Sequence, residues 1–407
     1  MAGPNAMPWN RTNPAKERVK FALEWERRWD AGEGRVNVSE LCREFGVSRQ
    51  AAYRWLRRYR DAGHDVSALV ERSHRPHHCP HEIPPEVQDV IVAARKYRPT
   101  WGPRKLRAHL VDGNPGVSVP SESAIAAILH RNGLTSLRRR KRRRLVAPAT
   151  RPFAAATGPN AVWCVDFKGW FRTGDGRRCY PLTLIDAYSR YLLRCEALVE
   201  PDGAHVQPIF DSAFQEFGTP DAIRSDNGPP FASTGAGGLT TLSVWWQKLG
   251  VRHDRITPGK PQQNGRLERF HRTLAELVGT PAADARAQQR AFDRIRHDYN
   301  HQRPHEALRL KPPVTAYAPS SRRYPRKLDR FEDVAADQLR VDRDGYVRWQ
   351  RRRVFLSSAL AHELVTVEPD DALDDERWVV RWASIVLGWI DHRRLDRGLI
   401  LPARRRR

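Results

Sequence analysis

Three acidic residues stand where metal-dependent chemistry would place them. Asp166 lies within an apolar run, and Asp226 ends another apolar run just before an Asn-Gly turn. A buried carboxylate without a partner is costly, so each aspartate needs a cation or hydrogen-bond donors. With Glu268 early in a nearby helix, the three would bind two divalent ions, one activating an attacking hydroxyl and one stabilising the leaving oxygen. Oxygen ligands alone favour Mg²⁺ or Mn²⁺ over zinc.

Each of these residues also has an ordinary structural interpretation. Glu268 could form an ion pair on the helix surface with Arg272, one turn later. Asp166 could cap a neighbouring segment, and Asp226 could serve only as the turn residue before Asn227. Taken singly, these alternatives stay open. The combination of all three residues favours a metal site.

The segments around the acidic residues predict a mixed α/β domain. Strand patterns cover 161–167, 179–186, 191–198, 222–226 and 251–256, and helix patterns cover 204–217 and about 242–246. The first three strands are expected to form an antiparallel meander. The stretch 257–272 begins as a Gly/Pro-rich loop and continues as a helix with Leu267, Phe270 and Leu274 on one face. That loop would bring Glu268 to the two aspartates.

Residues 38–56 carry the pattern of a helix-turn-helix. Ser39 and Ser48 can cap two short helices, and Gly46 allows the turn between them. The second helix of such a unit enters the major groove of DNA. Its outward-facing polar and basic side chains are therefore candidate DNA contacts: Arg49, Gln50, Arg54, Arg57 and Arg58. An ordinary helical hairpin is the alternative.

A second module of three helix patterns follows, over 84–97, 101–110 and 121–129. Gly133 lies just past the third pattern, as is typical of a helix end. The exposed faces are basic and again indicate helix-turn-helix architecture, with Arg104 and Lys105 as candidate DNA contacts. Two such modules in tandem would span a longer DNA site than one.

Two linkers contain residue types that could bind ligands. The linker 73–81 holds potential zinc ligands, namely His74, His77, His78, Cys79 and His81. Prolines interrupt it and no second ligand pair lies at the usual spacing, so a plain linker is favoured over a zinc site. The run 138–144 is entirely basic and joins two domains, which favours phosphate contacts by Arg139, Arg140, Lys141 and Arg142.

Composition indicates a nucleic-acid partner. The 407 residues include 71 Lys and Arg against 47 Asp and Glu, a net charge of +24. Neutralising phosphates releases condensed counterions, so this charge favours an anionic polymer. The five scattered cysteines form no CxxC pair and are expected to be reduced, as in a cytoplasmic protein. No apolar run approaches the ~18 residues of a spanning helix, so no membrane partner is expected.

The sequence resembles the DDE transposases of bacterial insertion sequences, whose cores are similar to retroviral integrases and have a ribonuclease H-like fold. The resemblance is carried by Asp166, by Ser-Asp-Asn-Gly at 225–228 and by Pro-Gln-Gln-Asn-Gly-Arg-Leu-Glu-Arg at 261–269. Further matching stretches are 41–48, 101–106, 299–305 and 311–313. Together they cover most of residues 20–325.

The resemblance implies an enzyme that binds the terminal inverted repeats of a mobile element and catalyses 3′-end cleavage and strand transfer. It implies that Asp166, Asp226 and Glu268 are catalytic and hold two Mg²⁺ or Mn²⁺ ions per active site. Candidate DNA contacts near the site are Lys260, Asn264, Arg269 and Arg272. The expected partners are double-stranded DNA, at element ends and target, and further copies of the chain, with no small-molecule substrate. We expect it in the bacterial cytoplasm, associated with the nucleoid.

Two alternatives to this function come from other classes. One is a sequence-specific DNA-binding regulator with an inactive core, and the other is a ribonuclease H-like nuclease without strand transfer. A degraded core would usually have lost a carboxylate, whereas all three are present here. The sequence therefore favours the transposase.

The sequence departs from the resembled families in two places. Asp226 and Glu268 are 42 positions apart, several more than is common in the family, and the excess is placed in 233–238, which is predicted to be a flexible insertion. The His/Cys zinc module of retroviral integrases is missing, and the helix-turn-helix modules stand in its place.

Strand patterns at 345–349, 353–356, 364–367, 378–382 and 385–389 predict a small C-terminal β-barrel, SH3-like by resemblance to integrases. Its aromatic residues alternate with arginines, which fits contacts with DNA or another subunit and equally fits barrel core and rim. The predicted organisation is a helix-turn-helix domain (15–72), a linker (73–81), a second helix-turn-helix domain (82–137), a basic linker (138–158), a ribonuclease H-like α/β core (159–325) and the barrel (326–402).

Overall fold

The computed structural model describes residues 13–32, 35–71, 82–113, 116, 118–135, 156–257, 261–325, 338–370, 377–391, 393 and 398–402. The histidine-containing linker, Lys260 and the basic run with Arg139, Arg140, Lys141 and Arg142 lie outside the described residues. The chain divides into two compact units, Met1–Glu82 and Ile83–Arg407. No helix among the described residues has the length and apolar character needed to cross a membrane.

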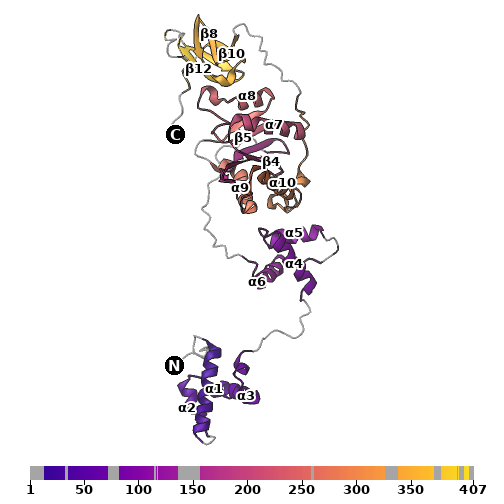
Figure 1. Ribbon diagram of the computed structural model, residues 1–407, viewed down its shortest axis with the longest axis vertical. Helices are drawn as coiled ribbons and strands as arrows, with labels where there is room; N and C mark the ends of the chain where they lie inside the picture. The colour runs from indigo at the N-terminus through magenta and orange to yellow at the C-terminus, as the bar shows by residue number, and fades with distance from the viewer. Residues whose placement is uncertain are drawn as a thin grey trace. The chain divides into compact units, whose positions relative to one another are not determined.

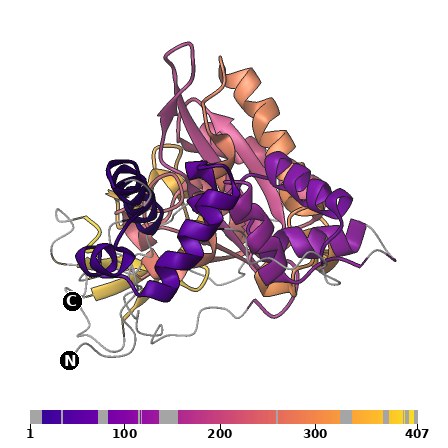
Figure 2. The ribbon, with the colours of Figure 1, turned by 90° about the horizontal axis from the view of Figure 1, so that it is seen from below.

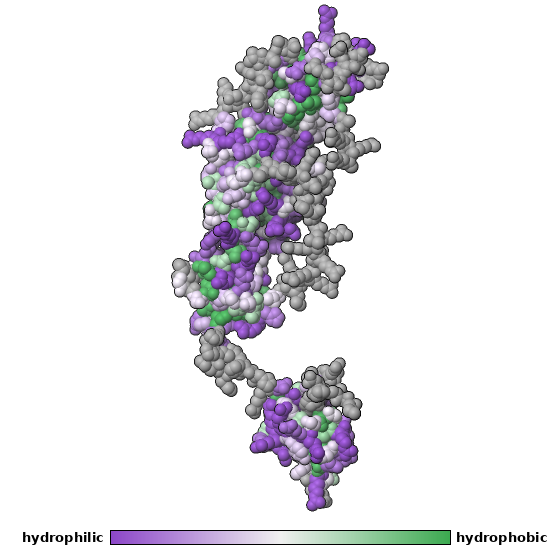
Figure 3. Space-filling view, turned by 180° about the vertical axis from the view of Figure 1, so that it is seen from behind, coloured by the Kyte–Doolittle hydropathy of each residue, from purple (hydrophilic) through white to green (hydrophobic). Residues whose placement is uncertain are grey.

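The N-terminal unit is a small helical domain. Its elements are α1 (Pro14–Ala31), α2 (Val38–Glu44), α3 (Arg49–Asp61) and a short turn η1 (Val66–Leu69). The Ser48 hydroxyl caps α3 by accepting a hydrogen bond from the Ala51 amide, and Gly46 takes the left-handed conformation (φ +65°) that the turn between α2 and α3 requires. Hydrophilic side chains cover most of the face of this unit drawn in Figure 3.

The second unit begins with three short helices, α4 (Pro85–Tyr97), α5 (Pro103–Gly113) and α6 (Glu122–Arg131). Ile91, Leu106 and Ile125, one from each helix, are fully buried together with Trp101. Ser121 caps α6 with its hydroxyl. The three helices therefore share a core of their own, as the sequence predicted.

A six-stranded mixed sheet follows. Its strands are β1 (Val162–Phe167), β2 (Phe171–Arg172), β3 (Arg178–Asp186), β4 (Leu192–Leu198), β5 (Ala222–Ser225) and β6 (Arg252–Arg255). The order is β2-β3-β1-β5-β6, with β4 also paired to β3. The pairs β1-β3 and β3-β4 are antiparallel, as the predicted meander requires, whereas β1-β5 and β5-β6 are parallel.

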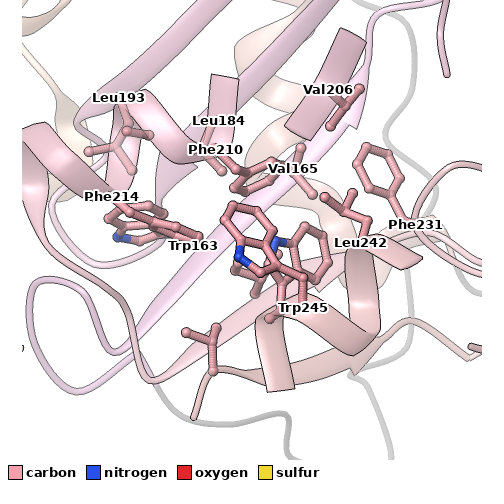
Figure 4. Close-up of a cluster of buried hydrophobic side chains, with 14 of the residues drawn as sticks. Trp163, Val165, Leu184, Leu193, Val206, Phe210, Phe214, Phe231, Leu242 and Trp245 are labelled. Atoms are coloured by element: carbon pink, nitrogen blue, oxygen red, sulfur yellow. The ribbon is translucent and has the colours of Figure 1, made fainter. Parts of the chain in front are cut away.

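Helices cover both faces of the sheet. On one face, α7 (Gly203–Phe217) and α8 (Thr241–Lys248) pack against the odd-numbered side chains of β1, where Trp163 stacks on Phe214 at 5.7 Å (Figures 1 and 4). On the other face, α9 (Gly265–Val278) and α10 (Ala285–His301) pack against the even-numbered side chains. Figure 2 shows these orange helices beside the pink strands. Short turns flank the last two helices: η3 (Pro261–Asn264), η4 (Glu306–Leu308) and η5 (Pro313–Ala316).

The C-terminal region consists of short strands: β7 (Gln338–Arg340), β8 (Tyr346–Trp349), β9 (Arg352–Phe355), β10 (Leu364–Pro369), β11 (Arg377–Trp382) and β12 (Ile385–Asp391), with a turn η6 (Ser358–Leu360). They form a four-stranded sheet, β12-β11-β10-β7, and a separate two-stranded sheet, β8-β9. The strands β8 to β12 lie where the sequence predicted strands, whereas β7 was not predicted. A closed barrel is not confirmed, because among the described residues the two sheets are not paired.

The segment 233–238, which we predicted to be a flexible insertion, packs against the C-terminal strands. It contains the turn η2 (Ala236–Gly238), and Ala236 and Leu239 share a hydrophobic cluster with the C-terminal strands. A Cβ atom on Gly237 would lie 3.0 Å from Ile385, so a residue without a side chain is needed at this contact. Together with an ion pair of 2.6 Å between Lys248 and Glu363, the insertion joins the C-terminal sheet to the core.

Candidate active site

The register of β1 and β5 brings Asp166 and Asp226 together. Cys164 is paired with Arg224 in these parallel strands, so two further residues along each strand lead to Asp166 and Asp226. Neighbouring strands are ~4.8 Å apart, and side chains at matching positions point to the same face. Cys164 belongs to the cluster under α9 and α10, so Asp166 points to the same face of the sheet.

Glu268 comes to this face from the first turn of α9. Leu267 and Phe270 are buried against the sheet, whereas Glu268 is exposed. The alternative interpretation of Glu268 predicted an ion pair with Arg272, but no ion pair within 4.0 Å joins these two described side chains. Glu268 is instead close enough to Asp166 for its charge to disfavour ionisation of that carboxyl group.

Asp166 is in an unfavourable electrostatic environment. Burial is the main cause, followed by the negative charges of Asp226 and Glu268, and together they raise the pKa of Asp166 to about 7. One backbone amide, that of Phe167, donates to its Oδ1 at 2.9 Å. Two aspartates at the ends of strands and a glutamate on α9 whose negative charges oppose one another are a donor set that fits divalent cations, because a cation would remove the repulsion.

The carboxylates of Asp166, Asp226 and Glu268 do not form a compact set. Among the described residues, the group of three potential ligands with atoms within 4.8 Å of one another is Glu200, Asp202 and His205, not the trio. Asp202 caps α7 by accepting from the His205 amide at 2.9 Å and from the His205 ring at 2.7 Å. Helix capping thus explains why Asp202 and His205 lie together in this second group.

Asp226 is held by its surroundings on both sides. Its Oδ1 accepts from the Gly228 amide at 3.2 Å, and its backbone oxygen accepts from the Ser225 hydroxyl at 2.8 Å. Ser225 in turn contacts Nε2 of His253 at 2.8 Å, and burial lowers the pKa of His253 to about 4. The side-chain amide of Asn227 donates to the Ile256 carbonyl at 2.6 Å. These contacts fix the turn that presents Asp226.

His271 is a supporting residue that the sequence analysis missed. Its Nε2 lies 2.7 Å from the Thr183 hydroxyl, which donates to the backbone oxygen of Asp166 at 3.1 Å. Its Nδ1 lies 4.0 Å from the Asp166 carboxylate. Burial lowers the pKa of His271 to about 4, so the ring is neutral at pH 7. Its position three residues after Glu268, on the buried side of α9, was the available signal.

In the N-terminal unit, Arg49, Gln50, Arg54 and Arg57 are all exposed on α3. Arg57 lies 3.6 Å from Asp61, which is also exposed. Arg58 differs from them, because its Nη2 donates to the Val70 carbonyl at 2.9 Å and its guanidinium lies over the Trp55 ring. The four exposed residues form one polar helix face, while Arg58 serves packing.

The candidate contacts of the second unit fall into two groups. Arg104, Arg269 and Arg272 are exposed. Lys105, which we expected on an exposed face, is half-buried, and Asn264 is buried with its Oδ1 lacking a hydrogen-bond partner. Burial, followed by the positive charge of Arg303, lowers the pKa of Lys105 to about 8.

Comparisons with known proteins match the same regions. The integrase core domain family matches residues 156–261 and, in a second form, residues 249–313. The uncharacterised 31.7 kDa protein of insertion element IS407 from Burkholderia multivorans is 34% identical over 291 residues, which are 69% of this chain and 90% of that protein. The chain belongs to the DDE transposases of bacterial insertion elements.

This membership identifies the central domain as an integrase core with the ribonuclease H-like fold. A further relative is the uncharacterised 39.2 kDa protein of insertion element IS476 from Xanthomonas euvesicatoria, 33% identical over 185 residues, or 44% of this chain and 51% of that protein. Among solved structures, the simian T-cell lymphotropic virus intasome with the PP2A regulatory subunit B56 gamma has a TM-score of 0.36 at 16% identity, covering 78% of this chain and 100% of that chain.

The transposase also carries helix-turn-helix DNA-binding domains. A helix-turn-helix domain family matches residues 24–77, and a homeodomain-like family matches residues 51–129. These ranges include α3 with its exposed polar face and the helices α4 to α6. These matches confirm that the helical modules predicted from the sequence are helix-turn-helix units.

Proposed function

We propose that the chain binds the terminal inverted repeats of its element through the helix-turn-helix domains and catalyses metal-dependent 3′-end cleavage and strand transfer. One observation supports the proposal most strongly. Asp166 and Asp226 lie at matching positions of two paired parallel strands, and the charge of Glu268 acts on Asp166. The alternatives with an inactive core lack support, since a core without metals would gain from losing one of these carboxylates.

In this function Asp166, Asp226 and Glu268 hold two Mg²⁺ or Mn²⁺ ions. Bound there, the ions supply charge neutralisation for an in-line phosphoryl transfer by water or by a DNA 3′-hydroxyl. The turn fixed by Ser225 and Asn227 orients Asp226, and Glu268 approaches the aspartates through the first turn of α9. No covalent protein–DNA intermediate is required, because the protein contributes positioning and electrostatics.

The chain is proposed to act as an oligomer on DNA. One acidic trio can process one strand end at a time, and a mobile element has two ends that must join one target. At least two copies of the chain are therefore needed in the assembly. The domain bounds derived from the sequence, including an SH3-like C-terminal domain, remain part of this proposal.

The test is a gel assay with Mg²⁺, a labelled terminal repeat and a supercoiled target. We expect nicked ends and joined products from the wild-type chain, and neither from Asp226→Asn, which should still shift the terminal repeat. A regulator would shift the repeat without cutting it, and a plain nuclease would cut without joining. Full cleavage by Asp226→Asn would sink the assignment of the trio.

A further inference from the structure

A second group of charged residues lies where the helices α4 to α6 meet the catalytic core. Arg98 at the end of α4 forms a two-pronged ion pair with Asp298 on α10, with one N–O distance of 3.1 Å. On the other side, Lys311 pairs with Asp112 at 2.8 Å. The first pair holds the end of α4 to α10, and the second holds α5 to the segment that follows α10. Lys105 lies on α5.

Positive charge gathers at this junction. The charges of Lys105, Arg269 and Arg303 all act on His305, and the charges of Arg303 and Arg269 also act on Lys105. His305 is fixed by a contact of 2.8 Å between its Nε2 and the Tyr299 hydroxyl, and Tyr299 packs against Phe270, the neighbour of Arg269, at 4.9 Å. We call Lys105, Arg269, Arg303 and His305 the junction cluster.

Arg303 is the unusual member of the cluster. Its exposed fraction is 6%, and its Nη1 is buried without a hydrogen-bond partner. Buried guanidinium groups are normally satisfied by carboxylates or carbonyls, and leaving one incomplete is costly. The negative charge of Glu276 acts on Arg303, but Nη1 of that guanidinium still lacks a hydrogen-bond partner among the described residues.

The other two cations also lack a partner. Neither Lys105 nor Arg269 has an ion pair within 4.0 Å among the described side chains. Burial lowers the pKa values of Lys105 and Arg303, so the folded chain disfavours their charged forms. A bound anion would reverse this cost, because an opposite charge within ~4–6 Å favours the charged form.

We propose that the junction cluster is a binding site for one backbone phosphate of duplex DNA, with Lys105 and the unpartnered Arg303 as its principal contacts. Arginine offers a fork of donors that matches phosphate geometry, and lysine adds a compact charge. This site rests on the proposed function for its ligand. Because Arg269 follows Glu268 directly, the phosphate belongs to the DNA that enters the active site, and it ties the second helix-turn-helix unit to that DNA.

The experiment measures binding of the full-length chain to a labelled duplex carrying the element's end, in metal-free buffer so that no strand is cut. We expect Lys105→Gln to weaken binding roughly tenfold at moderate salt and to reduce the slope of log K against log salt by about 1. Arg303→Gln should act in the same direction, and the double variant should lose little more, because both residues hold one phosphate. Exposed Arg290→Gln on α10 is the matched control and should change neither quantity.

A second measurement locates the phosphate. Each backbone phosphate of the duplex is replaced in turn by a neutral methylphosphonate. At one position, the methylphosphonate should weaken DNA binding by the wild-type chain but leave DNA binding by Lys105→Gln unchanged. If Arg303→Gln does not fold, as judged by circular dichroism, Lys105→Gln still decides the question.

The possible failures are distinguishable. A wild-type chain that does not prefer the element's end over a scrambled duplex would contradict the proposed function, and the ligand assigned here with it. A wild-type chain that prefers the end, while Lys105→Gln keeps the full affinity, the salt slope and the methylphosphonate pattern, would overturn the junction site alone.

Discussion

Replacing Asp166 by asparagine should stabilise the metal-free protein, although most substitutions of partly buried residues destabilise. Burial and the charges of Asp226 and Glu268 raise the pKa of Asp166 from 3.8 to about 7. A difference of about 3 in pKa corresponds to roughly 4 kcal/mol between the charged and neutral forms. Asparagine has a similar shape and no charge, so the variant avoids most of this cost.

The stability difference between Asp166→Asn and the wild-type chain should depend on pH. Below about pH 4 the carboxyl group is protonated in folded and unfolded chains, and Asp166 costs no stability. Between about pH 4 and pH 7 the unfolded chain ionises while the folded chain holds its proton, so the wild-type chain loses stability as the pH rises. From about pH 5.5 to pH 8, the advantage of Asp166→Asn should widen by roughly 2 kcal/mol.

The assay is thermal unfolding of the full-length chain with a chelator present, at about pH 5.5 and about pH 8, following the transition of the core. A domain of this size shifts its melting temperature by about 2–4 °C per kcal/mol, so the gap should widen by about 5 °C. Exposed Asp293→Asn is the matched control and should show no such widening. Added Mg²⁺ should raise the melting temperature of the wild-type chain and leave Asp166→Asn unchanged. An Asp166→Asn protein that melts below the wild-type chain at about pH 8, or a gap equal at both pH values, would refute the reasoning.

Two further substitutions test the surroundings of the site. In Gly228→Ala the new Cβ would lie 3.2 Å from Oδ2 of Asp226, and displacing that carboxylate should slow single-turnover cleavage roughly tenfold with DNA binding intact; an unchanged rate would contradict the fixed turn. Lys248→Met leaves the Glu363 side chain, only 14% exposed, without its partner and should cost about 3 kcal/mol in urea unfolding, whereas Lys248→Met/Glu363→Leu should recover most of the loss. A double variant no more stable than the single one would show that the ion pair does not join the C-terminal sheet to the core.

The parts of the fold that depend on local patterns were predictable from the sequence. The apolar runs around Asp166 and Asp226 are strands, and the capping residue Ser48 begins a helix as expected. These features follow from periodicity and from hydrogen bonds within a few residues, which the sequence displays directly. The parallel pairing of β1 with β5 leaves no local signal, because the two strands are 60 residues apart in the sequence.

Features set by contacts between distant segments were not predictable. From the sequence, Lys105 looks like one more basic residue on an amphipathic helix. Its pKa is lowered by burial and by the charge of Arg303, which is remote in the sequence. From the sequence, Gly237 looks like part of a flexible loop, because the C-terminal strand that packs on it lies far from it along the chain. In both cases the local pattern is compatible with exposure, and only the tertiary contact decides.

The first turn of α9 links the two sites proposed for this transposase. Glu268 acts on Asp166 at the sheet, while its neighbour Arg269 acts on Lys105 and His305 at the junction cluster. Asn264 at the start of this turn has a buried Oδ1 without a hydrogen-bond partner and provides no side-chain cap. A phosphate at the junction would therefore restrain the same turn that must bring Glu268 to the aspartates. Because such coupling is reciprocal, DNA held there should tighten metal binding by the trio as much as metal tightens the hold on DNA.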